Sequence, residues 1–232
     1  MRRSTTALLL ALVVASVGVG AVVVRDHFAR EPLPDPPAEA TRDAARRYAT
    51  GYEEAHLRNR VRGAADASVG EATATVTPVG DGYLVRVGCP YGYSKGGAER
   101  DYRSESAYYV ADGVGVRVEP ERRDGESADA ERRLDLRAYD FAGTGDLRVR
   151  VNRVGASGAQ TTVFDRTFEF DGTGGALVSG AVGGAGVYEL VVRADGETVR
   201  QRVELTSALD AHVVVAPGGD VDVVTTDGRE NG

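Results

Sequence analysis

Few residues in this chain have the types and spacing that chemistry requires, and no set of them forms a complete active site. Cys89 is the only cysteine, which excludes an intramolecular disulfide and a zinc site built from cysteines. A nucleophilic thiol would need a histidine base, and the chain has only His27, His56 and His212. Because Cys89 alternates with valines in a strand-like run, we predict a buried side chain that acts as a small hydrophobe. His212 opens a short strand, where we expect it on the surface.

Two motifs match functional patterns without the context that those functions need. Glu53 and His56 have the Glu-x-x-His spacing that places both side chains on one helix face, but di-iron sites use this motif twice. Residues 92–96 read Gly-x-Ser-x-Gly, as in many hydrolases, yet that nucleophile opens directly into a helix and here a strand is expected. We therefore predict no catalytic residue, no cofactor-binding residue and no metal ligand. The exception would be a metal held jointly by Glu53, His56 and a carboxylate from the neighbouring sheet.

The most distinctive local composition lies in residues 89–97, CPYGYSKGG, which we expect to form a loop. Tyrosine side chains on an exposed loop can supply the large, rigid contact area that anchors a protein partner. Tyr91, Tyr93 and Lys95 are therefore the candidate contact residues. The alternative is that these tyrosines pack within their own domain.

The charged residues carry a strong bias that bears on the partner and on the source. The net charge is −7, and Lys95 is the only lysine, so arginine supplies every other basic side chain apart from histidine. A carboxylate-rich surface without a basic stripe argues against nucleic acid as a partner. Acidic, lysine-poor surfaces stay solvated at high salt, and in this respect the chain resembles proteins of salt-loving archaea. An acidic protein of a GC-rich bacterium would show the same bias.

The N-terminal region has the features of a membrane anchor over residues 1–30. Residues 7–24 are wholly apolar or small and follow Arg2 and Arg3. As a helix, the uncharged stretch would be about 30 Å long, which matches the hydrocarbon core of a bilayer. Because cytoplasmic segments favour arginine and lysine, we predict a cytoplasmic N-terminus, contact of residues 7–24 with the lipid bilayer, and an extracellular bulk. A cleaved signal peptide is the alternative, since small residues over 16–21 offer a cleavage site, and it also implies export.

Beyond this region the chain changes from a proline-rich segment to a helix and then to strands. Residues 31–37, EPLPDPP, predict a stiff, extended spacer. Asp35 is the expected N-cap of a helix whose apolar residues recur at spacings of three and four, with Glu53 on another face. Stretches of period two follow up to residue 119. The pattern over 38–119 predicts an α+β domain in which one helix lies on a four-stranded antiparallel meander.

Two short patterns in this domain resemble those of known exported proteins. The helix reads A-x-x-x-A-x-x-x-Y-x-x-x-Y-E-E-A over residues 40–55, and residues 108–113 read Tyr-Tyr-Val-x-Asp-Gly. With these patterns the domain resembles the helix-plus-sheet domains of cystatin-like or NTF2-like shape in exported, membrane-anchored haloarchaeal proteins. The resemblance implies a cleft between helix and sheet, which NTF2-like folds sometimes use for small ligands.

The second half of the chain reads as strands and turns after a charged boundary. Residues 120–131 mix carboxylates with arginines and small residues, which predicts an acidic linker. Over 132–226, a succession of short strands with glycine-rich turns predicts an all-β immunoglobulin-like sandwich, with 227–232 as a tail. Residues 184–192, GAGVYELVV, resemble the tyrosine-corner strand of that family, which implies that the Tyr188 hydroxyl bonds to the backbone. The antibody cysteine is missing from this strand, and the chain has no tryptophan.

The sequence as a whole predicts a non-enzymatic envelope protein of the cell surface. We expect an anchor, a spacer and two domains that bind a cell-surface protein or serve a structural role, without a cofactor. The alternative function is an exported enzyme or small-ligand sensor that uses the cleft of the α+β domain. Polar side chains from both helix and sheet in one deep pocket would favour this alternative. A core filled by Tyr, Ala and Val would favour the binding module.

Overall fold

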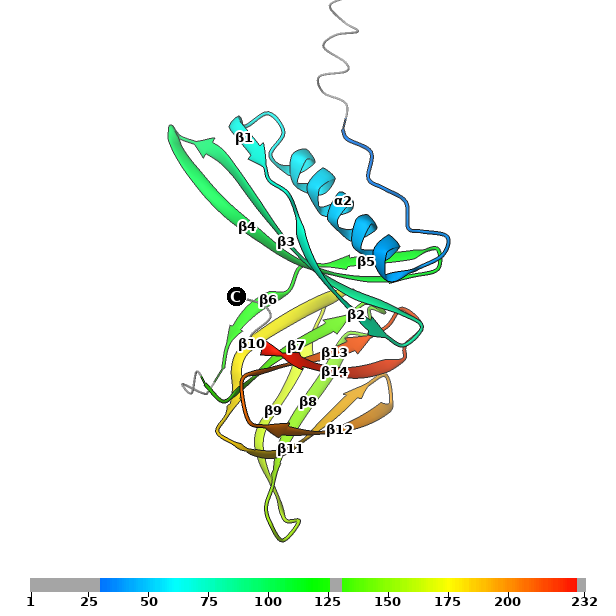
Figure 1. The fold of residues 1–232 in the computed structure, drawn as a ribbon, viewed down its shortest axis with the longest axis vertical. Coiled ribbons are helices and arrows are strands. Elements are labelled where there is room, and N and C mark those ends of the chain that lie inside the picture. The colour runs from blue at the N-terminus through cyan, green and yellow to red at the C-terminus, as the bar shows by residue number, and fades with distance from the viewer. Residues whose placement is uncertain (1–29, 126–130, 229–232) are drawn as a thin grey trace, which may run out of the picture.

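The computed structural model describes residues 30–125 and 131–228, and in these ranges the chain is mostly β. A helix and a first sheet lie above a sandwich formed by two further sheets (Figure 1). The upper unit contains α2 (Arg42–Arg60), β1 (Ala65–Val69), β2 (Thr73–Val79), β3 (Gly82–Lys95), β4 (Ala98–Ala111) and β5 (Val114–Val118). The sandwich contains β6 (Glu121–Asp124), β7 (Arg133–Asp140), β8 (Asp146–Val154), β9 (Gln160–Glu169), β10 (Gly174–Gly183), β11 (Gly186–Ala194), β12 (Glu197–Leu205), β13 (Leu209–Val215) and β14 (Val221–Asp227).

The first sheet is built around two long strands, β3 and β4, which pair along almost their whole length as an antiparallel hairpin. β5 lies on the far side of β4, whereas β2 and β1 both pair with β3, one after the other along its second edge. α2 covers one face of this sheet (Figure 1). The helix begins after Thr41, whose hydroxyl accepts a hydrogen bond from the Ala44 amide at 3.2 Å, so the predicted N-cap Asp35 is wrong.

The core between α2 and the sheet follows the two periods seen in the sequence. On the helix, Ala45 is followed by buried residues three and four positions later, and on β3 the buried residues Val85 and Val87 alternate on the face toward the helix. One buried cluster contains Ala45, Tyr48 and Ala49 of the helix with Val76, Val85, Val87, Tyr108 and Val110 of the sheet. Small helix residues therefore let the backbone approach the larger side chains of the strands.

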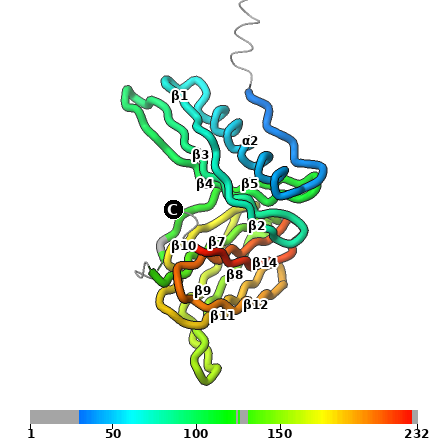
Figure 2. Tube along the Cα trace, viewed as in Figure 1, coloured from blue at the N-terminus to red at the C-terminus, as the bar shows by residue number. Residues whose placement is uncertain are grey.

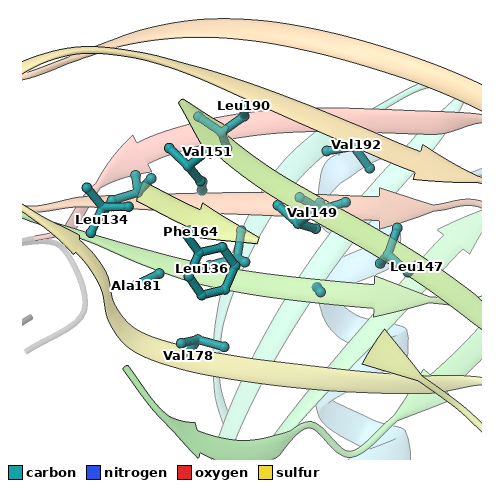
Figure 3. Packing of buried hydrophobic residues seen from close by; sticks show 14 of the residues in the cluster. Leu134, Leu136, Leu147, Val149, Val151, Phe164, Val178, Ala181, Leu190 and Val192 are labelled. Carbon is teal, nitrogen blue, oxygen red and sulfur yellow. The ribbon is translucent and has the colours of Figure 1, made fainter. Parts of the chain in front are cut away.

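The lower unit is a β-sandwich. One of its sheets has the strand order β14-β13-β7-β10-β6, and the other has the order β12-β11-β8-β9. Alternate residues of both sheets point into one core, in which Leu134, Val149, Phe164 and Leu190 lie close together (Figure 3).

The fold class predicted from the sequence is wrong in several respects. The first sheet has five strands instead of a four-stranded meander, because β1 adds to the edge of β3. The sandwich contains two parallel pairs, β6 with β10 and β13 with β7, so we describe it without the immunoglobulin-like assignment. Residues 121–124, which were expected in an acidic linker, form β6 at the edge of a sheet. Charged side chains are common on such edges, where they mask the alternation that identifies a strand.

The described part of the chain contains no helix that is both long and apolar enough to cross a membrane. The transmembrane helix of the predicted fold class is thus not seen in this part of the chain. Residues 7–24, to which it was assigned, lie outside the described residues, as does most of the predicted tail.

The two units share a hydrophobic core, which we call the junction core. It contains Val79, Leu84, Ala107, Tyr109 and Val118 of the first sheet with Tyr139, Phe141, Val214 and Ala216 of the sandwich. The ring centre of Tyr109 lies 5.9 Å from that of Phe141, and the Tyr109 hydroxyl donates a hydrogen bond to Asp81 Oδ1 at 2.6 Å. The two units are therefore packed against each other and are not joined by an exposed linker alone.

Residues 31–37, predicted to be a spacer, form neither helix nor strand, and they run back along α2 (Figure 2). The Glu31 amide donates to Asn59 Oδ1 at 2.8 Å, and Asn59 Nδ2 donates to the Glu31 carbonyl oxygen at 2.9 Å. At the other end, the Gly113 amide donates to the Pro37 carbonyl oxygen at 2.8 Å. We call this segment the N-terminal strap, because both of its ends are bonded to the upper unit.

The predicted backbone contact of Tyr188, in β11, is confirmed. Its side chain is 1% exposed, and its hydroxyl donates to the carbonyl oxygens of Gly184 at 2.8 Å and Gly183 at 3.2 Å. The bond ties the start of β11 to the loop that precedes it.

Replacing Tyr188 with phenylalanine should lower the free energy of unfolding by about 1 kcal/mol, because the ring stays in place while the hydrogen bonds of the hydroxyl are lost. Denaturant unfolding of the full chain, followed by circular dichroism, measures the change. Tyr83→Phe is the matched control, since its hydroxyl has no hydrogen-bond partner among the described residues. Equal losses in the two variants would show that the Tyr188 hydroxyl contributes nothing specific.

Candidate functional site

The candidate contact residues Tyr91 and Tyr93 lie on β3 and not in a loop, because β3 and β4 stay paired as far as Lys95 and Ala98. Their rings stack on the ring of Tyr102, which lies between them on β4. The centroid distances are 5.2 Å to Tyr91 and 5.4 Å to Tyr93, and both interplanar angles are 19°. We call these three half-buried residues the tyrosine ladder. Aromatic cross-strand pairs of this kind stabilise an antiparallel hairpin and fix its side chains.

The ladder continues the sheet face that α2 covers, beyond the end of the helix. Arg60, in the last turn of α2, holds its guanidinium group 6.0 Å from the centre of the Tyr91 ring. Lys95, the third candidate, is exposed at the end of β3. The contact between the hydroxyl groups of Tyr93 and Tyr102 raises the pKa of Tyr93 and lowers the pKa of Tyr102.

The strand that carries Tyr102 has an open edge along its outer half. β5 pairs with β4 only from Ala107 to Ala111, and no strand in the described ranges pairs with this edge over residues 98–106. This part of the hairpin projects from the rest of the molecule (Figure 1). Residues 98–103 of this edge are exposed or half-buried, whereas Ser104 and Ser106 are buried, so the accessible stretch of the edge is 98–103, beside the tyrosine ladder.

A buried charged network between α2 and the sheet was missed by the sequence analysis. Glu53 is fully buried, and its carboxylate accepts hydrogen bonds from Arg117 Nε at 2.8 Å, Arg117 Nη2 at 3.1 Å and the Tyr108 hydroxyl at 2.6 Å. Arg117 Nη2 also donates to Ser106 Oγ at 2.8 Å. Burial alone would raise the pKa of Glu53, but the hydrogen bonds and charge of Arg117 outweigh burial and lower this pKa. Glu53 is therefore ionised at neutral pH.

The sequence did carry a signal for this burial. Glu53 follows Ala49 by four positions and precedes Leu57 by four, and all three are fully buried. We expected Glu53 on another face of the helix because carboxylates usually avoid an apolar stripe. This expectation is wrong, since Glu53 is buried with the stripe. Only its partner on β5, far away in the sequence, makes this position favourable for a charge.

The hypothesis of a metal held by Glu53 and His56 is not supported by their positions. Glu53 is occupied by the network above, and the ring of His56 stacks on Tyr52 with 6.4 Å between centres. In the described ranges, no group of three His, Cys, Asp or Glu side chains is placed to hold a metal ion.

The space between α2 and the sheet is filled by aromatic rings. Tyr48, Tyr52 and Tyr108 lie with their ring centres 5.9, 6.3 and 5.7 Å apart. Burial raises the pKa of Tyr48 to about 12, so this hydroxyl stays protonated at neutral pH. The interface between α2 and the sheet is therefore packed with Tyr, Ala and Val side chains around one buried ion pair.

Neither nucleophile candidate has the surroundings of a catalytic residue. Cys89 is buried as predicted, and burial raises the pKa of its thiol to about 11, which leaves it protonated at neutral pH. Ser94 lies near the end of β3, where its hydroxyl donates to Asp66 Oδ2 at 2.8 Å. The chain after Ser94 turns into β4, whereas a hydrolase nucleophile opens into a helix.

The prediction that His212 lies on the surface is wrong, because β13 is an interior strand between β7 and β14. The side chain is fully buried, Nε2 lies 3.1 Å from Thr226 Oγ1, and the ring stacks on Tyr139. Burial, with the positive charges of Arg86 and Arg137, lowers the pKa of His212 well below its usual 6.5. The ring is therefore neutral at pH 7.

Among the described residues, the tyrosine ladder is half-buried at the end of the sheet. The network of Glu53 is buried and ties α2 to the sheet. No protein-family model matches this chain, and a search of curated proteins found no match.

Proposed function

We propose that this chain is a non-enzymatic binding module of the cell surface, which holds a partner protein on the hairpin of β3 and β4. The observation that carries the proposal is the tyrosine ladder beside the open edge of β4. The proposal includes two expectations from the sequence: the bulk of the chain is extracellular, and residues 7–24 contact the lipid bilayer.

In this proposal, an extended segment of the partner adds a strand along residues 98–103 of β4, the exposed part of its open edge. The backbone groups of the open edge supply the hydrogen bonds, and neighbouring side chains supply the specificity. A partner side chain opposite Tyr102 would lie about 5 Å away, within reach of the tyrosine ladder. Because the Tyr102 ring is already held by stacking on Tyr91 and Tyr93, little side-chain entropy is lost when the partner binds.

The charges on this edge favour a protein strand as the partner. The charged residues on either side of Tyr102 alternate in sign along the strand. They are Glu99, Arg100, Asp101 and Arg103. A polyanion would meet a carboxylate beside every arginine, whereas a peptide strand with the opposite order of charges would pair with each in turn. The same charges disfavour indiscriminate pairing of the open edge.

Photo-crosslinking in the source cells tests the proposal. A crosslinking residue at position 100 of the full chain is expected to link a different membrane or envelope protein, and one at position 114 is not. Val114 is suited as the control because it is exposed, at 37%, but lies on β5 away from the ladder. Adding Tyr102→Ala to the position-100 chain should weaken binding of the identified protein about 30-fold, in line with loss of about 2 kcal/mol at an aromatic anchor.

The outcomes separate the proposal from its rivals. A crosslinked protein whose binding is lost with Tyr102→Ala and kept with Val114→Ala supports it. A crosslink only to a second copy of this chain would replace the partner protein with self-association. A crosslink that is unchanged by Tyr102→Ala would show that the ladder is not the contact surface.

A further inference from the structure

A cavity of about 320 Å³ lies where the first sheet meets the sandwich, on the sheet face opposite α2. Its walls come from β2, β3 and β4 on one side and from β7 on the other, with Pro120 at the connection between the units. Its volume is at the lower end of the range for cavities that hold small molecules. The cavity is separate from the tyrosine ladder, which lies on the other face of the sheet.

Arginine side chains dominate the lining of this cavity. Arg86, Arg103 and Arg137 line it, and Glu105 is the carboxylate among the lining residues. The side chains of Arg86 and Arg137 are only 13% and 18% exposed, whereas Arg103 is an exposed residue. Because removing a guanidinium group from water is costly, two such groups at one buried place require a compensating negative charge.

Two carboxylates near the cavity already form ion pairs with arginines. Arg86 and Arg137 both approach the same oxygen of Asp210, at 3.5 Å and 3.2 Å. Glu105 bonds to Arg122, outside the lining, at 2.6 Å. In a chain whose net charge is −7, this cavity is therefore a local region of positive charge. A bound anion would be attracted to the three arginines of the lining.

The third arginine is placed by a glycine on the neighbouring strand. A Cβ atom at Gly88 would lie 2.7 Å from Nη2 and 2.9 Å from Nε of Arg103, so any side chain there would push the guanidinium group away. In its observed position, Arg103 Nη2 donates to Thr73 Oγ1 at 3.2 Å, and the Thr73 hydroxyl donates to the Gly88 carbonyl oxygen at 3.2 Å. The guanidinium group is thus held against β3 beside the cavity.

We infer that this cavity binds a small anion that carries a carboxylate or phosphate group. Arg103 is the exposed arginine of the lining, and the paired N–H donors of a guanidinium group match two oxygens of a carboxylate or a phosphate. Arg86 and Arg137, which are bonded to Asp210, add positive charge to the wall of the cavity. The volume suits a molecule of the size of a tricarboxylic acid or a sugar phosphate. The inference does not depend on the proposed partner of the hairpin, because the two sites lie on opposite faces of the first sheet.

Calorimetric titration of the full chain tests this inference, with mild detergent because residues 7–24 are apolar. Citrate and inorganic phosphate serve as separate probes at constant ionic strength. We expect saturable binding of at least one of them. Arg103→Gln should weaken binding at least tenfold, whereas Arg202→Gln, which removes the same charge from an exposed position on β12, should leave it unchanged.

A second variant separates the position of Arg103 from its charge. Gly88→Val keeps every arginine but displaces the guanidinium group of Arg103, so it should weaken binding as much as Arg103→Gln does. Circular dichroism of each variant shows whether the fold is retained. Binding of citrate alone would assign the site to carboxylates, and binding of phosphate alone would assign it to phosphates. No saturable binding of either probe, or equal affinities in Arg103→Gln and Arg202→Gln, would overturn the inference.

Discussion

Replacing Glu53 with alanine is expected to lower the free energy of unfolding by about 3–5 kcal/mol, the range for breaking a buried ion pair from one side. The variant leaves the Arg117 guanidinium group, which is 16% exposed, without the carboxylate that accepts two of its hydrogen bonds. It also removes the acceptor of the buried Tyr108 hydroxyl. Denaturant unfolding of the full chain measures the loss.

Two comparisons show whether the loss comes from the uncompensated charge. Glu119→Ala removes an exposed carboxylate that lies 3.7 Å from the same arginine, and it should cost less than about 1 kcal/mol. The double variant Glu53→Met with Arg117→Met should regain most of the lost stability, because apolar side chains of similar size can replace a buried pair. A double variant as unstable as Glu53→Ala would show that packing, and not charge, explains the loss.

The same residue determines part of the acid sensitivity. In the folded chain the pKa of Glu53 lies below its ordinary 4.5, because Arg117 outweighs the effect of burial. A carboxyl group with a depressed folded pKa contributes stability that is present above the unfolded pKa and is lost as the pH falls through the folded pKa. The difference in stability between the wild-type chain and Glu53→Gln should therefore be constant near neutral pH and shrink below about pH 4.

Replacing Tyr109 with alanine should cost about 3–5 kcal/mol, as for other large aromatic side chains removed from a core. Tyr109 is 2% exposed in the junction core, against Phe141. The loss falls on the contact between the two units, so we also expect the variant to separate their unfolding. Hydrogen exchange measured by mass spectrometry should show α2 and β11 opening together in the wild-type chain and independently in Tyr109→Ala.

Phe168→Ala is the matched control for this prediction. Phe168 is an equally buried aromatic residue, but it lies in the core of the sandwich away from the junction. Its removal should destabilise the chain by a similar amount and leave the opening of α2 and β11 coupled. Independent exchange of α2 and β11 in the wild-type chain would contradict the role given to the junction core.

The features that could be predicted from the sequence are those set by neighbouring residues. The spacing of Ala45, Tyr48 and Ala49 indicated the helix, because one turn brings these positions to the same face. Glycine-containing turns indicated the hairpins, and the pattern around Tyr188 indicated a hydroxyl bonded to nearby carbonyls. In each case the partners lie within a few residues of each other.

The features that were missed depend on partners far apart in the sequence. Glu53 and Arg117 are separated by 64 positions, so nothing near Glu53 reveals the charge that makes its burial favourable. Residues 89–97 looked like a loop because of their glycines and proline, yet pairing with β4 keeps residues 89–95 in a strand. The arginine cavity depends on β3, β4 and β7 meeting across the two units, which no local pattern specifies.

The N-terminal strap determines from which side the tyrosine ladder can be approached. Because Glu31 is bonded to Asn59, the chain leaves the upper unit at the end of α2 where Arg60 meets Tyr91 (Figure 2). The hairpin and residue 30 therefore lie at the same end of the molecule, and the sandwich lies at the other end. With residues 7–24 in the bilayer, as proposed, the sandwich is the outermost part and the ladder lies near the lipid surface. Recognition through the ladder is then lateral, between neighbours in one membrane, and does not reach across to an opposing cell.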